Sequence, residues 1–325
     1  MLKNILAIHT GGTISMSQNE QGGVVQNDDN PIDNNDVLGL SDVNIINEDL
    51  FNLPSPQMNS KTMLQITKRI QKAIADGIDG VVVTHGTDTL EETAYFLDLT
   101  LPNTVPVVVT GAMRSSNEIG ADGVFNFKSA IQVAADDQAK SKGVLVVFNT
   151  GIYAARFVTK THTTSVDTFK DPIYGTLGTI DHDKVIFAQQ LIGSEYTEVK
   201  EVVDNVYLLK AYAGMSGTIF DGINNDQTKG VLIEALGAGN LPKETLPAVQ
   251  RLIDRGIPVV LVSRCFSGSA QPIYAYAGGG IELEDMGVIF CTQLNGQKAR
   301  IKLIVGLSCG KKGKDLCDYM ANALS

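Results

Sequence analysis

Short apolar runs alternate with amphipathic stretches along the first half of the chain. Four runs of mostly β-branched residues are typical of buried strands: residues 5–8, 81–83, 105–109 and 144–148. Between the first two runs, apolar residues recur at helical spacing from Met63 to Ile74, and this predicts a helix packed against a sheet. Alternation of strands and helices favours a mostly parallel sheet with helices on both faces.

A second α/β pattern begins near residue 206. Residues 206–212, 231–236 and 258–262 are its predicted strands, and residues 245–255 and 297–307 are its predicted helices. The stretch 191–205 is polar and shows little periodicity. We therefore predict a larger N-terminal domain with a doubly wound sheet (1–190), a linker (191–205) and a smaller C-terminal α/β domain (206–325). The length of 325 residues agrees, because a single core rarely fills so long a chain.

Residues 18–36 are rich in Asn, Asp, Gln and Gly. A polar segment of this length inside a compact domain predicts a long mobile loop, and such loops often close over active sites.

Composition and charge exclude several classes of protein. The net charge of −10 and the pI of about 4.9 make nucleic acid an improbable partner, because an acidic surface repels phosphate. The first apolar run is too short for a signal peptide, and no run reaches the roughly 18 apolar residues of a membrane span, so we expect a cytoplasmic protein. The four cysteines contain no C-x-x-C spacing and the histidines form no ligand pattern, so we expect reduced thiols, no metal and no cofactor.

The first candidate motif, residues 9–14 (His-Thr-Gly-Gly-Thr-Ile), follows the first predicted strand. Glycines there allow close approach of the backbone to a ligand, and a threonine hydroxyl on such a turn can act as a nucleophile. A plain glycine turn or a phosphate-binding loop is the alternative. The spacing fits neither the dinucleotide fingerprint nor the P-loop, which disfavours a nucleotide-dependent dehydrogenase.

The second motif, residues 84–94, places Thr87 and Asp88 where a strand ends and a helix is expected to begin. Asp88 or Thr89 could instead cap that helix, with Glu91 or Glu92 completing a capping box. The adjacent His85 is better interpreted as a hydrogen-bonded structural residue than as a catalytic one.

Two further segments combine hydroxyls with other polar groups. Residues 110–116 form another glycine turn, and residues 159–164 place Lys160 among threonines. A lysine beside a pair of hydroxyls can favour deprotonation or take part in proton relay. Together, the four segments predict one polar site at the carboxyl edge of the sheet.

These segments resemble the bacterial asparaginase/glutaminase family. The resemblance rests on residues 9–14, 85–89, 110–114 and 158–161, and it extends to residues 238–242 and 294–300. It covers nearly the whole chain, and two threonine motifs in this order and context are highly specific.

The resemblance implies an L-asparaginase that needs no cofactor and acts through a threonine acyl-enzyme. It assigns the nucleophile to Thr13 and a triad to Thr87, Asp88 and Lys160. It also assigns contacts with the substrate to Gly12, Ser55, Gly86, Thr87, Asp88, Ala112 and Asn240, with Asp88 holding the α-ammonium and Asn240 supplied by a neighbouring subunit of a homodimer or homotetramer.

The chain departs from the family pattern at the expected proton acceptor. The best-known members carry a tyrosine on the mobile loop, whereas Gly23 stands at that place and the first tyrosine of this chain is Tyr95. We therefore consider Tyr274 or Tyr276 as the base. Packing in the core or at an interface is the alternative role for both tyrosines.

A second departure concerns the glutamate with which some secreted members bind the substrate amine. That position falls near Gly278–Gly280, and Glu282 and Glu284 stand close by but out of register. Low glutaminase activity is the expectation from this difference. The alternatives to an asparaginase are a glutaminase-asparaginase, the amidase half of a tRNA-dependent amidotransferase, and a non-catalytic amino-acid-binding protein on the same scaffold.

Overall fold

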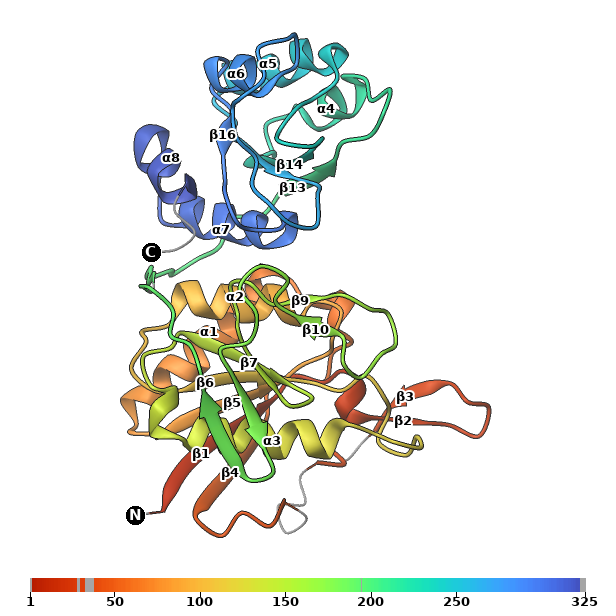
Figure 1. The fold of residues 1–325 in the computed structure, drawn as a ribbon, viewed down its shortest axis with the longest axis vertical. Helices are drawn as coiled ribbons and strands as arrows, with labels where there is room; N and C mark the ends of the chain where they lie inside the picture. The colour runs from red at the N-terminus through yellow and green to blue at the C-terminus, as the bar shows by residue number, and fades with distance from the viewer. Residues whose placement is uncertain (1, 28–29, 33–37, 194, 322–325) are drawn as a thin grey trace. The chain divides into compact units, whose positions relative to one another are not determined.

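The computed structural model describes residues 2–27, 30–32, 38–193 and 195–321, and the chain divides into two compact units, Met1–Tyr196 and Thr197–Ser325 (Figure 1). Each unit is an α/β domain with its own sheet, as the pattern predicts. The described residues between 188 and 205 form no helix or strand. The finer limits of the linker stay a prediction.

The first unit is built on an eight-stranded sheet with the order β12-β11-β8-β7-β6-β5-β1-β4. The strands from β4 to β7 run parallel, and β8, β11 and β12 are antiparallel to their neighbours. The prediction of a mostly parallel sheet is confirmed. The bounds are β1 (Lys3–His9), β4 (Val43–Asp49), β5 (Gly80–Thr84), β6 (Val107–Thr110), β7 (Val144–Phe148), β8 (Gly151–Ala154), β11 (Gly178–Asp181) and β12 (Lys184–Phe187).

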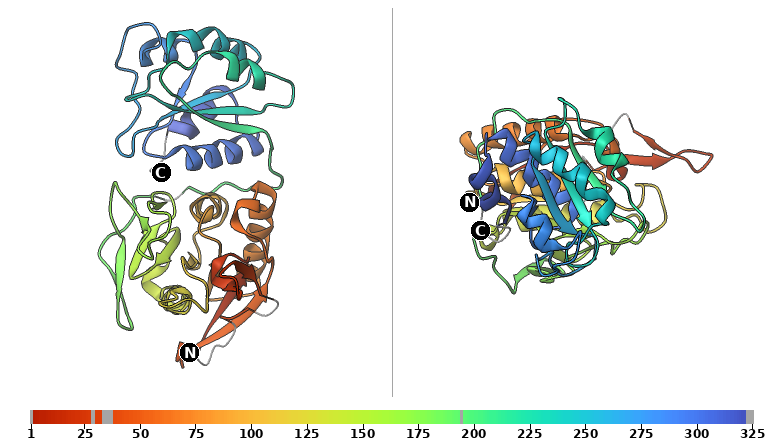
Figure 2. Two further views of the ribbon diagram at one scale, coloured as in Figure 1. Left: turned by 90° about the vertical axis from the view of Figure 1, so that its right-hand side faces the viewer. Right: turned by 90° about the horizontal axis from the view of Figure 1, so that it is seen from above.

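Helices cover both faces of this sheet, because alternate strand residues point to opposite sides. Ile5 and Ala7 of β1 lie in one core cluster with residues of α3 (Gly123–Ala135). Leu6 and Ile8 lie in another cluster with residues of α1 (Ser60–Ala75) and α2 (Leu90–Thr100). Figures 1 and 2 show α3 on one side of the strands and α1 and α2 on the other. The predicted apolar face of α1 is therefore confirmed.

Two small hairpins extend from this framework. The strands β2 (Met16–Gln18) and β3 (Val24–Gln26) form a hairpin that projects from the body of the unit (Figures 1 and 2). The prediction of one long loop over residues 18–36 is therefore wrong at residue 18 and at 24–26, and its residues 28–29 and 33–36 lie outside the described residues. The second hairpin joins β9 (Thr159–Lys160) to β10 (Phe169–Lys170).

The second unit contains a four-stranded parallel sheet in the order β13-β14-β15-β16. Its strands are β13 (Val206–Lys210), β14 (Gly230–Ala235), β15 (Val259–Ser263) and β16 (Ile289–Phe290). Its helices are α4 (Thr218–Ile223), α5 (Leu246–Asp254), α6 (Gly280–Asp285), α7 (Gly296–Ser308) and α8 (Gly313–Ala321). The two predicted helices of this unit correspond to α5 and α7. None of the four cysteines forms a disulfide.

Across the ranges that the structure describes, no helix combines the length and apolar character needed to cross a membrane.

Candidate active site

The register of three parallel strands brings the first three motifs to one level of the sheet. His9 at the end of β1 pairs with Thr84 of β5, and Thr84 pairs with Thr110 of β6. Two backbone hydrogen bonds continue this alignment beyond the strands, from Thr10 N to Thr84 O (3.1 Å) and from His85 N to Thr110 O (2.8 Å). The loops after β1, β5 and β6 therefore start side by side.

Glycines allow these loops to touch through their backbones. Gly12 has a φ of 88°, and a Cβ on it would lie 2.3 Å from the Cα of Gly86. A Cβ on Gly86 would in turn lie 2.7 Å from the Cβ of Ser55. A side chain at position 12 would have to displace backbone, and one at position 86 would have to displace Ser55, so both glycines serve close approach of the loops.

Thr13 follows this contact as the first residue of a short 3-10 turn, Thr13–Ser15. Its side chain is half-buried, and its hydroxyl makes no hydrogen bond to any residue that the structure describes. Within the same described set, the backbone N–H groups of Gly12, Thr13 and Thr87 also make no hydrogen bond. The hydroxyl of Thr13 and these N–H groups, on loops that touch at Gly12 and Gly86, are the kinds of group required of a nucleophile with an oxyanion-binding site.

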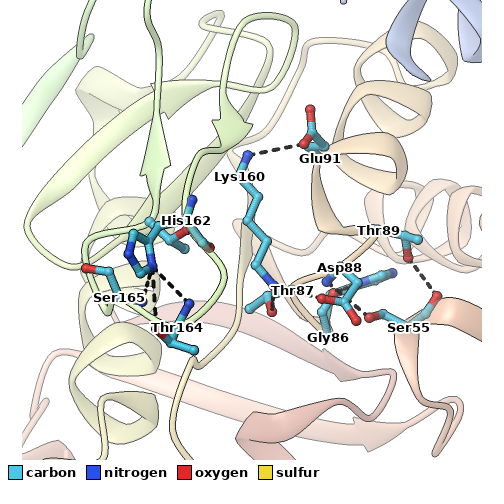
Figure 3. A network of polar contacts seen from close by, with 12 residues as sticks. Ser55, Gly86, Thr87, Asp88, Thr89, Glu91, Lys160, His162, Thr164 and Ser165 are labelled. Carbon is cyan, nitrogen blue, oxygen red and sulfur yellow. Dashed lines mark hydrogen bonds and ion pairs between the residues drawn. The ribbon is translucent and has the colours of Figure 1, made fainter. Parts of the chain in front are cut away.

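The structure brings Lys160 to Thr87 and Asp88, which precede it in the sequence by 73 and 72 positions. The Nζ of Lys160 donates to the Oγ1 of Thr87 at 2.9 Å and to the Oδ1 of Asp88 at 2.7 Å. Figure 3 shows the lysine side chain extended between the two residues. The side chain of Lys160 is 17% exposed and that of Asp88 is 59% exposed, so Asp88 also faces solvent from which a substrate can arrive.

Ser55 connects a further segment of the chain to Asp88 and Thr89. It begins the 3-10 turn Ser55–Gln57, its hydroxyl accepts from the backbone N–H of Asp88 (3.2 Å), and its carbonyl accepts from the Oγ1 of Thr89 (2.8 Å). Thr89 is the N-cap residue of α2 but its side chain makes no capping hydrogen bond. The capping-box alternative is therefore wrong, because the hydroxyl of Thr89 bonds to Ser55 instead.

Ala112 lies in the third loop, where the half-buried Asp122 and the buried Asn126 fix the backbone on both sides of it. The carboxylate of Asp122 accepts from the N–H of Met113 (3.1 Å), and the Nδ2 of Asn126 donates to the carbonyl of Gly111 (2.9 Å). A direct bond from the Nδ2 of Asn126 to Asp122 (3.0 Å) links the two clamping residues. Sequence reasoning missed this pair, although Asp122 stands directly before α3 as a helix-start signal.

His85 supports the second loop from inside the protein. Its ring is fully buried, with Nδ1 bonded to Gly86 O (2.8 Å) and Nε2 bonded to Thr93 Oγ1 (2.9 Å). Burial lowers the pKa of His85 from 6.5 to about 4, although the hydrogen bond to Gly86 acts in the opposite direction. These contacts agree with the structural role expected from the sequence.

This histidine makes a pH-dependent contribution to stability. The unfolded state binds a proton on His85 below pH 6.5, whereas the folded state resists it down to about pH 4. The stabilisation is therefore complete above pH 6.5 and declines by roughly 3 kcal/mol as the pH falls to 4. We expect the difference in unfolding free energy between the wild type and His85→Gln to shrink by about that amount over this range, measured by urea denaturation. A difference that does not vary with pH would contradict the assignment.

Gly23, which stands where the loop tyrosine was expected, lies in the turn of the β2–β3 hairpin. Its backbone N–H donates to the Oδ1 of Asn19 (2.9 Å), and its surroundings are exposed. The hairpin is held by the loop after β6, where Ser116 N donates to Met16 O (2.9 Å) and Asn117 Oδ1 accepts from Gln18 N (2.7 Å).

The remaining candidates lie in the second unit. Asn240 forms an isolated β-bridge with Leu236 just after β14. Tyr274 and Tyr276 are 44% and 54% exposed, and their ring centroids are 5.5 Å apart. The exposure contradicts the alternative that they pack in the core. Glu282 is committed locally, because its carboxylate accepts from the N–H of Gly278 at 2.7 Å.

Among the described residues, no group of three or more His, Cys, Asp or Glu side chains is arranged to hold a metal ion.

Both units match protein families of known type. Residues 4–193 match the family model described as "Asparaginase, N-terminal", and residues 205–320 match the one described as "Glutaminase/Asparaginase C-terminal domain". The chain is 41% identical to a probable L-asparaginase of Deinococcus radiodurans, covering 97% of this chain and 96% of that protein. It is 34% identical to an L-asparaginase of Bacillus licheniformis, with coverage of 96% and 98%.

A solved structure is similar over nearly the whole length of the chain. The crystal structure of a probable cytoplasmic L-asparaginase from Campylobacter jejuni matches with a TM-score of 0.86 and 33% identity, covering 98% of this chain and 99% of that one.

Proposed function

This chain belongs to the asparaginase family, and from that premise we propose that it hydrolyses L-asparagine to L-aspartate and ammonia through an acyl-enzyme on Thr13. One observation supports the proposal most strongly. The Nζ of Lys160 contacts both Thr87 and Asp88, and the loop that carries them touches the loop of Thr13 through Gly12 and Gly86. The loop that carries the proposed nucleophile is thus in contact with the loop whose threonine and aspartate bond to Lys160.

The proposed reaction has two steps. The Oγ1 of Thr13 adds to the side-chain amide carbon of asparagine, and the negative charge on the amide oxygen is stabilised by the backbone N–H groups of Gly12, Thr13 and Thr87. The C–N bond then breaks, and the nitrogen leaves as ammonia after taking up the proton lost by the hydroxyl. Water adds to the resulting ester with help from the Thr87–Lys160 pair, which restores Thr13 and releases aspartate.

The charges of the amino acid suit the same residues. Asp88 has one carboxylate oxygen bonded to Lys160, and its exposed carboxylate can bind the substrate ammonium through a charge-assisted hydrogen bond. We assign the α-carboxylate to Ser55, the leaving amide to the backbone of Ala112, and further contacts to Gly12, Gly86 and Asn240. Asn240 belongs to the second unit. From the resemblance to the family alone, we propose that a neighbouring subunit of a homodimer or homotetramer supplies it.

We also propose a cytoplasmic location. The similarity to the structure of a probable cytoplasmic L-asparaginase from Campylobacter jejuni supports this proposal.

The proton of Thr13 requires an acceptor, and we propose that Tyr274 or Tyr276 supplies it in place of the missing loop tyrosine. Replacing the tyrosine that acts as base by phenylalanine is expected to lower kcat by about 100-fold, the lower range for loss of a general base. Tyr212→Phe, a change of another exposed tyrosine of the second unit, is the matched control and is expected to keep full activity. Wild-type kcat in both Tyr274→Phe and Tyr276→Phe would exclude this base.

The proposed function is tested by ammonia release from L-asparagine and from L-glutamine. Release from asparagine, with a much slower rate on glutamine, is the expected result. Comparable rates on both amides would make the protein a glutaminase-asparaginase, and binding of asparagine without release of ammonia would make it an amino-acid-binding protein.

A further inference from the structure

The position of Lys160 depends on a short piece of secondary structure. The strand β9 contains only Thr159 and Lys160, and it pairs with β10 in a two-stranded sheet separate from the eight-stranded one. Two residues provide few backbone hydrogen bonds, and a lysine side chain has many rotamers. Additional contacts are therefore needed to keep the ammonium at Thr87 and Asp88.

Glu91 supplies such contacts from the first turn of α2. Its Oε1 accepts from the Oγ1 of Thr159 at 3.0 Å and from the backbone N–H of Lys160 at 3.1 Å. The residue is only 4% exposed, so these bonds lie in a region of low dielectric, where they are stronger than on the surface. Figure 3 shows the carboxylate at the backbone of Lys160, opposite to the direction in which the lysine side chain extends.

The residues that contact Lys160 all lie at or directly before the start of α2. Thr87 and Asp88 come directly before α2, and Glu91 lies in its first turn. Lys160 is therefore held at both of its ends by one continuous segment. Thr87 and Asp88 contact its ammonium, and Glu91 contacts its main-chain N–H. A shift of β9 relative to α2 would break both sets of bonds together.

We propose that Glu91 is a positioning residue for the reaction, which fixes β9 against α2 and so holds the Nζ of Lys160 between Thr87 and Asp88. This inference rests on the proposed function, because its main measurement is the rate of that reaction. Glu91 does not touch the reacting atoms; it acts through the main chain of Lys160. A displacement of about 1 Å at a catalytic group can cost roughly 100-fold in rate.

Two replacements of Glu91 separate its hydrogen bonds from its bulk. Glu91→Ala removes the acceptor and is expected to lower kcat by about 100-fold with KM changed less than about threefold, because Asp88 and Ser55 remain to bind the substrate. Glu91→Gln keeps an acceptor oxygen in the same place, and it is expected to stay within about fivefold of the wild-type kcat. Thr159→Val removes one donor to Glu91, and its kcat is expected to lie between those of Glu91→Ala and Glu91→Gln.

Thr100→Val is the matched control for loss of a buried hydrogen bond in the same helix. The hydroxyl of Thr100 donates to Phe96 O (2.7 Å) at the far end of α2 and is fully buried. Its removal is expected to lower the Tm while leaving kcat unchanged. Wild-type kcat in Glu91→Ala, or equal loss of kcat in Glu91→Ala and Glu91→Gln, would overturn the proposal; Glu91→Gln and Thr159→Val still decide it if Glu91→Ala does not fold.

Hydrogen exchange gives a measurement that does not depend on activity. The amide of Lys160 donates to Glu91, so peptides that contain it are expected to exchange faster in Glu91→Ala than in the wild type or in Thr100→Val. Unchanged exchange in Glu91→Ala would overturn the anchoring contact. If the wild type releases no ammonia from asparagine, the proposed function fails, whereas this measurement still tests the contact itself.

Discussion

Replacing Thr13 by alanine is expected to lower kcat for L-asparagine by roughly four to six orders of magnitude, the range seen when a nucleophile is removed. The half-buried hydroxyl makes no hydrogen bond to the described residues, and the loop that carries it touches the loop of Thr87 through Gly12 and Gly86. Without this oxygen no acyl-enzyme forms. Ammonia release under single-turnover conditions measures the loss directly.

Two comparisons make this test specific. Thr13→Ser keeps a hydroxyl and is expected to retain measurable turnover, whereas Thr13→Ala should still bind L-aspartate, because the proposed contacts to its charged groups come from Ser55 and Asp88. Calorimetric titration with aspartate distinguishes loss of chemistry from loss of folding. More than a tenth of wild-type kcat in Thr13→Ala would assign the nucleophile to another residue.

The central parallel strands and the helix packed on them can be predicted from the sequence, because their signals are local. The apolar run at residues 5–8 and the apolar face from Met63 to Ile74 show in the sequence which residues of each element are buried. The antiparallel strands β8, β11 and β12 have no such signal. β11 and β12 alternate buried or half-buried with exposed residues over only four positions each, and pairing with distant β8 fixes the place of β11, with β12 beyond it at the edge.

The glycine turns were also predictable, since positive φ and close backbone approach require glycine at position 12. The hydrogen bonds that support these turns from other parts of the chain could not be predicted. Ser55, Asp122 and Glu91 act on residues 9 to 69 positions away, and in the sequence each has an ordinary local explanation such as a turn or a helix start. Thr89 illustrates the difficulty, because it occupies the capping position but bonds to Ser55.

Lys160→Met is expected to lower kcat for asparagine by about 1,000-fold, within the usual range for loss of acid–base assistance. Methionine keeps most of the side chain's volume but cannot donate to Thr87 (2.9 Å) or Asp88 (2.7 Å). KM is expected to change little, because the exposed carboxylate of Asp88 remains in place for the substrate ammonium. Lys170→Met is the matched control, since Lys170 lies on the adjacent strand β10 and pairs with Asp167 instead. Steady-state ammonia release gives both constants.

The double variant Lys160→Met/Thr87→Val tests whether the two residues act as a unit. Thr87→Val alone removes the hydroxyl to which Lys160 donates, so each single change eliminates the same contact. The double variant is then expected to lose about as much kcat as the more damaging single variant, roughly 1,000-fold, instead of the product of the two losses. A multiplicative loss of about a million-fold would mean that Lys160 and Thr87 assist different steps. In that case Thr87 would act on the substrate without the lysine, and the 2.9 Å contact would have no part in catalysis.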